Sequence, residues 1–156
     1  TTIDLSAWST TDDAEGEKTP HTPDTLPDEP QIRTALQKLI GHIEQTPPVY
    51  SAIKVQGRRA YDLARKGQQV ELKSRIVRID RIDLLHYAYP HLTLEITCGQ
   101  GTYIRSLARQ IGERIGTAGY LTELRRTAIG PYHVDRATAP DDLPNPIAQH
   151  HLLDPP

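Results

Sequence analysis

Phenylalanine and methionine are absent from the 156 residues of this chain, and cysteine and tryptophan each occur once. Because the single Cys98 cannot form an internal disulfide, the sequence excludes domains that depend on a disulfide framework. No Cys/His spacing indicates a metal site, and the proline-rich surroundings of His150-His151 favour solvated side chains over metal ligands. No apolar run reaches the length of a membrane span, and residues 1–9 lack the pattern of a signal peptide. We therefore expect a cytoplasmic protein without a metal or a membrane contact.

The net charge of −2 conceals an uneven distribution of charged residues along the chain. Residues 1–30 contain eight acidic residues and one lysine, whereas residues 54–81 contain nine basic and three acidic residues. Residues 101–126 contain five arginines and two glutamates. A chain with a basic middle can bind a polyanion despite a negative overall charge, so nucleic acid is a candidate partner.

A strand pattern changes into a helix pattern at the octet CGQGTYIR, residues 98–105. Apolar and polar residues alternate over residues 92–98, which predicts a strand with one buried face. Apolar residues then recur at helical spacing over residues 104–115. Gly99 and Gly101 permit a tight turn between the two elements.

The start of this predicted helix is a candidate binding site. Thr102 is the predicted N-cap, and the free N–H groups of a helix N-terminus suit an anionic group. Tyr103 and Arg105 lie off the apolar stripe and are free to face a ligand. The simpler interpretation is that Arg105 pairs with a surface carboxylate, and the octet alone does not decide between the two.

The other elements follow from the same periodicities and from turn residues. Asp28 and Gln31 have the spacing of a capping box, and Gly41 is expected to end that helix. Gly116 is expected to end the helix after the octet. Strands are predicted over residues 1–8, 49–55, 70–72, 75–85 and 132–134, with a break near Asp80-Arg81, and a short helix over residues 58–66.

Cations and aromatic rings are concentrated between residues 45 and 67. The residues concerned are Lys54, Arg58, Arg59, Arg65 and Lys66, with Tyr50 just before them and Tyr61 among them. Cations bind phosphates, and aromatic rings stack on unpaired bases, so the pattern is typical of RNA binding. A solvated basic helix is the alternative interpretation.

Four motifs, taken in order, resemble one known family. They are QTPPVYSAIK at residues 45–54, RRAYDLARKG at 58–67, CGQGTYIR at 98–105 and LTELRRT at 121–127. In this order they resemble the bacterial TruB family, the tRNA pseudouridine synthases that act on a uridine of the T-loop. The resemblance runs from about residue 11 to about residue 137.

The resemblance implies an α+β fold with a mixed, mainly antiparallel sheet and flanking helices. It implies that residues 1–137 are the C-terminal portion of a catalytic domain and that residues 138–156 are a proline-rich tail. Residues 45–67 would be the thumb that grips the T-arm of tRNA, through Lys54, Arg58, Arg59, Tyr61 and Arg65. The reaction requires neither a metal nor a cofactor.

The resemblance also implies roles for residues around the octet. Tyr103 would stack near the flipped uracil, and Arg105 would pair with the catalytic aspartate and hold it ionised. Leu124 would form a wall of the pocket, and Arg125 or Arg126 would bind backbone phosphate.

The catalytic aspartate itself has no counterpart in this chain. The family carries it in a G-x-L-D-P-like loop, whereas Asp4 lies within a predicted strand, and Asp12 and Asp13 lie in an acidic loop. We therefore expect that an N-terminal half supplies the aspartate and that this chain alone is inactive.

Two smaller departures concern the octet and its helix. Gln100 stands where the family has a lysine, and Gln110 stands where it has an aspartate. Two other functions stay open: a non-catalytic tRNA-binding or tRNA-folding module, and a plain α/β scaffold without an RNA role.

Overall fold

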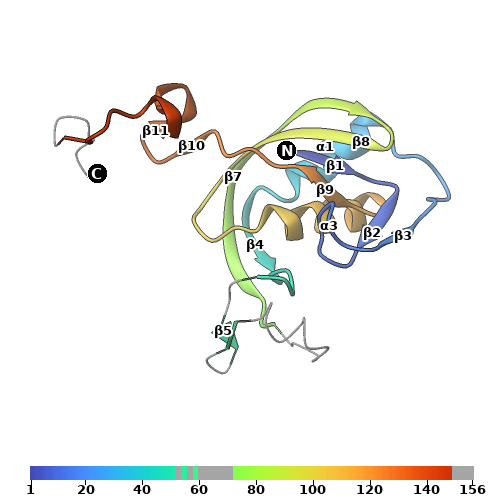
Figure 1. The fold of residues 1–156 in the computed structure, drawn as a ribbon. Coiled ribbons are helices and arrows are strands. Elements are labelled where there is room, and N and C mark those ends of the chain that lie inside the picture. The colour runs from blue at the N-terminus through green and yellow to red at the C-terminus, as the bar shows by residue number, and fades with distance from the viewer. Residues whose placement is uncertain (52–53, 56–57, 60–71, 149–156) are drawn as a thin grey trace. The chain divides into compact units, whose positions relative to one another are not determined.

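The computed structural model describes residues 1–51, 54–55, 58–59 and 72–148 (Figure 1). Its contacts divide the chain into two units, Thr1–Leu124 and Arg125–Pro156. Among the described residues, no helix has the length and apolar character needed to cross a membrane.

The first unit is built on a five-stranded sheet in which all neighbouring strands are antiparallel. In spatial order the strands are β4 (Gly41–Gln45), β7 (Arg75–Ala88), β8 (His91–Cys98), β1 (Thr2–Asp4) and β9 (Tyr120–Glu123). The alternation predicted over residues 92–98 is confirmed, because Leu92 and Leu94 are buried and Glu95 is exposed. Together with the two helices among the described residues, the sheet confirms the predicted α+β class.

Strand β7 contains the predicted break. Its pairing with β8 shifts register between Ile79 and Arg81, which leaves Asp80 as the extra residue of a bulge. Val77, Ile79 and Ile82 are all buried, although strict alternation would turn Ile82 to the opposite face. The bulge therefore allows both apolar runs to face one core. The strand continues three residues beyond the predicted end.

Two helices complete the core of this unit. Helix α1 (Glu29–Gln37) begins with the predicted capping box, in which Asp28 and Gln31 each bond the other's backbone N–H. Helix α3 (Ile104–Ile115) ends at Gly116, which has a φ of 74°. The helices contact each other, and their apolar faces join the sheet in one cluster: Ile32, Leu36 and Leu39 with Leu107, Ala108 and Ile111.

The single strand predicted over residues 1–8 is divided into two. Strand β1 ends at Asp4, and β2 (Ala7–Ser9) pairs with β3 (Lys18–Pro20) in a separate two-stranded sheet. The Asp4 carboxylate accepts hydrogen bonds from the backbone N–H and the hydroxyl of Ser6, at 2.8 and 2.6 Å. This local turn competes with continued pairing and ends the strand.

The segment with the predicted short helix begins as a hairpin. Strands β5 (Lys54–Val55) and β6 (Arg58–Arg59) pair antiparallel, so the helix predicted to begin at Arg58 is wrong at its start. Two residues, of which the second is glycine, separate the strands, a connection length typical of hairpins. Residues 60–66 lie outside the described residues, as do residues 70 and 71 of the predicted strand over 70–72.

In its described part, the second unit contains only short elements. Strands β10 (Ala128–Ile129) and β11 (Tyr132–His133) form a hairpin, in which Gly130 has a φ of 54°. Two single-turn 3₁₀ helices follow, Val134–Arg136 and Pro140–Asp142. The strand predicted over residues 132–134 is thus confirmed for its first two residues.

Candidate functional site

The junction between β8 and α3 has the predicted form of a strand, a glycine turn and a helix. The N–H of Gly99 donates to the carbonyl of Arg78 at 2.8 Å, and Gly101 has a φ of 87°, a conformation that favours glycine. Thr102 is not the N-cap, because its hydroxyl donates to the carbonyl of Gly99 at 2.9 Å. Tyr103 occupies the N-cap position without a side-chain cap.

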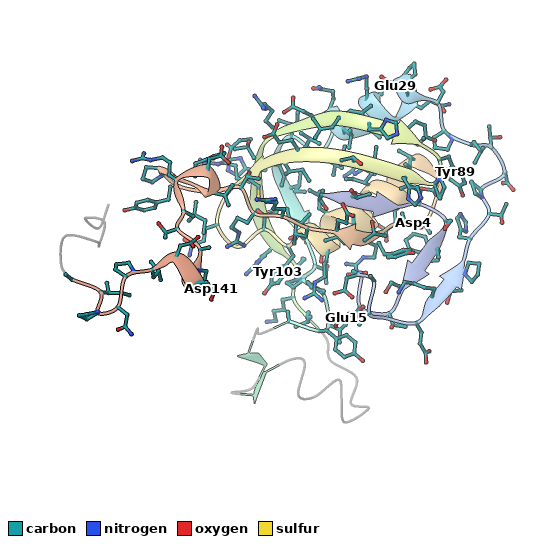
Figure 2. All side chains as sticks on the ribbon, turned by 45° about the horizontal axis from the view of Figure 1, so that its top comes forward. Asp4, Glu15, Glu29, Tyr89, Tyr103 and Asp141 are labelled. Carbon is teal, nitrogen blue, oxygen red and sulfur yellow. The ribbon has the colours of Figure 1, made fainter. Side chains whose placement is uncertain are left out.

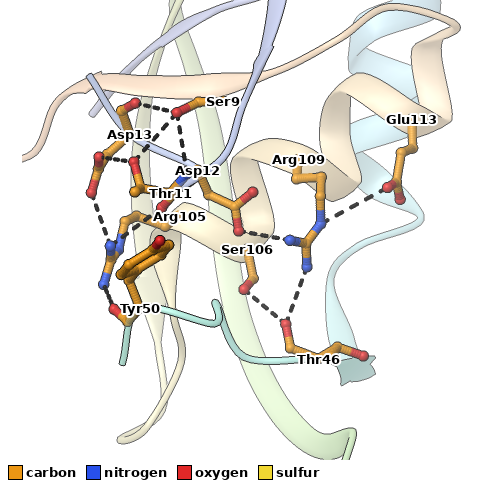
Figure 3. A network of polar contacts seen from close by, with 10 residues as sticks. All are labelled: Ser9, Thr11, Asp12, Asp13, Thr46, Tyr50, Arg105, Ser106, Arg109 and Glu113. Carbon is orange, nitrogen blue, oxygen red and sulfur yellow. Dashed lines mark hydrogen bonds and ion pairs between the residues drawn. The ribbon is translucent and has the colours of Figure 1, made fainter. Parts of the chain in front are cut away.

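Arg105, in the first turn of α3, is held by three acceptors from two distant segments (Figure 3). Its Nη1 lies 2.9 Å from Oδ2 of Asp13 and 3.3 Å from the carbonyl oxygen of Thr11. Its Nη2 donates to the carbonyl of Tyr50 at 2.8 Å. Because both branches of the guanidinium are engaged, its position is fixed. Of its five N–H groups, Nε–H and one N–H of Nη2 have no partner among the described residues and remain to bind a ligand.

Asp13, in the loop after β2, is itself held as an anion. Its Oδ1 accepts from the Thr11 hydroxyl at 2.5 Å and from the backbone N–H of Glu15 at 3.1 Å. Partial burial acts to raise the pKa of Asp13, but these hydrogen bonds and the Arg105 charge together lower it below its usual range. Asp13 is therefore ionised at neutral pH and neutralises part of the Arg105 charge.

A second ion pair lies one helical turn further along α3. Nη1 of Arg109 lies 2.7 Å from Oδ2 of Asp12, and Nη2 donates to the carbonyl of Thr46 at 3.3 Å. Asp12 is 6% exposed, and this burial raises its pKa, although the Arg109 charge opposes the shift. The same loop is anchored to β9, since the N–H of Leu121 donates to the carbonyl of Asp12 at 3.0 Å.

Polar side chains of α3 also hold the end of β4 and the residue that follows it. The hydroxyl of Ser106 donates to the Thr46 carbonyl at 2.8 Å, and Nε2 of Gln110 donates to the Glu44 carbonyl at 2.8 Å. One stripe of the helix thus connects the acidic loop to the start of the basic segment. Gln110 thus links α3 to β4.

Tyr103 is positioned by groups that the sequence analysis did not identify. Its backbone N–H donates to Oε1 of Gln45 at 2.8 Å, and Gln45 is fully buried at the end of β4. The guanidinium of Arg75 lies over the ring of Tyr103, 5.1 Å from its centre. Gln45 opens one of the recognised motifs, which is the only sequence signal that marks it.

The sequence identifies Asp12 and Asp13 only as acidic residues of a loop. The structure places both beside arginines of α3. The Asp4 carboxylate instead accepts hydrogen bonds from Ser6 and, at 3.3 Å, from the Tyr120 hydroxyl. Asp4 and Tyr103 lie apart in the molecule (Figure 2). The described residues contain no group of three or more side chains arranged to hold a metal ion.

The remaining predicted site residues belong to other segments of the chain. Leu124 ends the first unit and is 59% exposed. Arg125 and Arg126 are exposed and belong to the second unit. Lys54, Arg58 and Arg59 are described only as backbone of β5 and β6, and Tyr61 and Arg65 lie outside the described residues.

The chain is similar to pseudouridine synthases. The family model described as TruB family pseudouridylate synthase, N-terminal domain, matches residues 1–104. Three similar relatives are called tRNA pseudouridine synthase B. The one from Phocaeicola vulgatus is 46% identical over 78% of this chain, that from Thermobifida fusca 45% over 91%, and that from a Mycobacterium species 45% over 98%.

These matches cover 52%, 51% and 53% of the relatives, so the chain spans about half their length. Among solved structures, a chain from the crystal structure of a Cbf5-Nop10-Gar1 complex superposes with a TM-score of 0.56 at 25% identity. That match covers 86% of this chain and 31% of the other.

Proposed function

The chain belongs to the TruB family of pseudouridylate synthases. We propose that it supplies Arg105 and the residues around it to an active site that isomerises a T-loop uridine of tRNA to pseudouridine. The observation that carries this proposal is the guanidinium of Arg105, which is fixed in the first turn of α3, two residues after the half-buried Tyr103. The similar relatives named tRNA pseudouridine synthase B support tRNA as the substrate. A tRNA substrate and a single free cysteine support a cytoplasmic location.

The reaction breaks the bond between C1′ and N1 of the uridine, turns the uracil and forms a bond between C1′ and C5. The proton on C5 is then lost and N1 gains a proton, so the product is an isomer of the substrate. It needs an ionised carboxylate near the sugar and the base, and we place that carboxylate in an N-terminal half outside this chain. Arg105 would bind it through the donors that Asp13 and Tyr50 leave unused. A carboxylate paired with a guanidinium stays ionised and keeps its orientation.

Asp13 acts in this proposal as a positioning residue. Its lowered pKa keeps it charged, and its bond to Arg105 fixes the guanidinium before any substrate arrives. Such preorganisation avoids a reorganisation cost during the reaction. Tyr103 would stack on the flipped uracil, which must leave its own base stack to reach the site.

The remaining roles follow the sequence analysis. The basic residues Lys54, Arg58, Arg59 and Arg65, with Tyr61, would grip the T-arm. Leu124 would wall the pocket, and Arg125 or Arg126 would bind a phosphate. No metal or cofactor takes part in this scheme.

The test compares two proteins on unmodified tRNA transcripts, with pseudouridine measured by mass spectrometry. This chain alone is expected to form none, whereas the same chain joined to the natural sequence upstream of Thr1 is expected to modify one T-loop uridine. A transcript with cytidine at that position serves as the control. Turnover by this chain alone would mean that its nucleophile has been misplaced. Salt-sensitive tRNA binding without product in either protein would favour the non-catalytic tRNA-binding module.

A further inference from the structure

Arg75 lies beside the turn that carries Tyr103, although no motif pointed to it. It is the first residue of β7, and Gln45, the last residue of β4, is its cross-strand partner. Its Nη2 donates to the carbonyl of Gly101, and its guanidinium covers the Tyr103 ring at 5.1 Å. Gln45, fully buried, holds the N–H of Tyr103 from the interior, whereas exposed Arg75 contacts the same turn from the solvent side.

The charge of Arg75 distinguishes it from the other arginines of its strand. Arg78 pairs with Asp80 at 3.0 Å, and Arg81 pairs with Asp83 at 2.5 Å. Within the described residues, no carboxylate pairs with Arg75. Its guanidinium is therefore a positive charge without a counter-charge in that part of the chain.

The turn itself supplies no cation. Residues 99–103 contain no lysine or arginine, and Gln100 is exposed and uncharged. The carbonyl of Gly101 engages only one branch of the Arg75 guanidinium. The remaining N–H groups form a planar set that suits two oxygens of a phosphate.

We propose that Arg75 is an RNA-binding and positioning residue, which binds a backbone phosphate next to the base that stacks on Tyr103. The proposal rests on the proposed function, because it assumes that an RNA base reaches Tyr103. The ligand is a phosphodiester of RNA. Through its contacts with the Gly101 carbonyl and the Tyr103 ring, Arg75 would join phosphate binding to the orientation of that ring.

The experiment measures the affinity of this chain for a fluorescent T-arm RNA hairpin at several salt concentrations. Arg75→Ala is expected to weaken binding about tenfold at low salt and to reduce the salt slope by about one. Arg78→Ala is the matched control, since Arg78 is exposed on the same strand and already paired with Asp80. It is expected to leave affinity and salt slope unchanged.

A charge rescue separates phosphate binding from a structural role. Arg75→Lys, and Gln100→Lys introduced into Arg75→Ala, are both expected to restore most of the salt slope, because each returns one cation to the turn. Thermal unfolding of every variant shows whether the fold is retained. Inorganic phosphate is expected to displace the RNA no more than another salt does at the same ionic strength.

The outcomes distinguish this inference from the proposed function. If the unchanged chain binds the hairpin with a salt dependence and Arg75→Ala behaves identically, Arg75 is not a phosphate contact, and the proposed function stands. If the unchanged chain shows no salt-sensitive RNA binding, both are wrong. Loss of affinity that neither lysine variant restores also overturns the inference. So does displacement by inorganic phosphate, if that displacement depends on Arg75 more strongly than RNA binding does.

Discussion

The two ends of helix α3 are both rich in glycine, but they are constructed differently. At the N-terminal end, Gly99 and Gly101 are surrounded by side chains from other segments, and Arg75, Gln45 and Asp13 supply polar contacts.

At the C-terminal end, backbone packs on backbone. A Cβ built on Gly112 would lie 2.2 Å from the Ala118 carbonyl oxygen, and one on Gly119 would lie 2.5 Å from that of Ala108. Charged side chains can exchange partners when a ligand binds, whereas close backbone contact excludes any added atom. The first end therefore suits a site, and the second anchors the helix.

The largest effect is expected at the packed end. Gly112→Ala should lower the free energy of unfolding by about 3 kcal/mol, because its Cβ would overlap the backbone of Ala118 and force the chain apart. Chemical denaturation measures the change.

Gly99→Ala is the matched control at the other end. Its Cβ would meet Arg78 Cβ at 3.5 Å, an ordinary contact, so the change in unfolding free energy should stay within about 0.5 kcal/mol. Equal losses in the two variants would mean that the two ends do not differ in packing.

The next effect concerns Arg105 in a protein that also carries the N-terminal half. Arg105→Lys should lower the turnover number about a hundredfold, since a lysine cannot bridge Asp13 and the Tyr50 carbonyl while orienting a second carboxylate. Affinity for tRNA should change little, because we propose that the grip comes from the basic segment. Single-turnover kinetics and binding assays separate the two quantities.

Arg114→Lys provides the control for that change, as Arg114 lies exposed in the last turn of the same helix. It should leave turnover and affinity unaltered. If Arg105→Lys instead weakens tRNA binding and spares turnover, Arg105 is a phosphate contact, and its assigned role is wrong.

The smallest effect distinguishes the two aspartates by pH. Burial raises the pKa of Asp12, so its contribution to stability is full at low pH and is lost as pH rises through that pKa. The pKa of Asp13 is lowered, so its contribution is present above its unfolded-state pKa and is lost as pH falls. On acidification Asp12 should therefore take up its proton before Asp13.

Carboxyl ¹³C chemical shifts, followed by NMR against pH, measure this order directly. In denaturation experiments, the stability advantage of the unchanged chain over Asp13→Asn should shrink as pH falls. Its advantage over Asp12→Asn should shrink as pH rises. Parallel titration of the two carboxyl groups would contradict the assignment of Asp12 as the more buried partner.

The sequence alone determined the features that depend on neighbouring residues. The capping box of Asp28 and Gln31, the bulge beside Asp80, and the end of α3 at Gly116 all follow from local periodicity or from backbone conformations that few residues adopt. The strand–turn–helix form of the octet is of the same kind, and with the motif order it was enough to identify the family. Local signals failed where two short-range bonds compete, as when Thr102 bonds Gly99 instead of capping α3.

Only the tertiary structure decided which residues meet across the site. Arg105 and Asp13 are 92 positions apart, Arg109 and Asp12 are 97 apart, and Tyr103 and Gln45 are 58 apart. Periodicity reports which face of an element is buried, but it carries no information about which loop carboxylate approaches which arginine. That choice depends on how the sheet brings the loop after β2 and the end of β4 to one side of α3, and so on contacts made by the whole core.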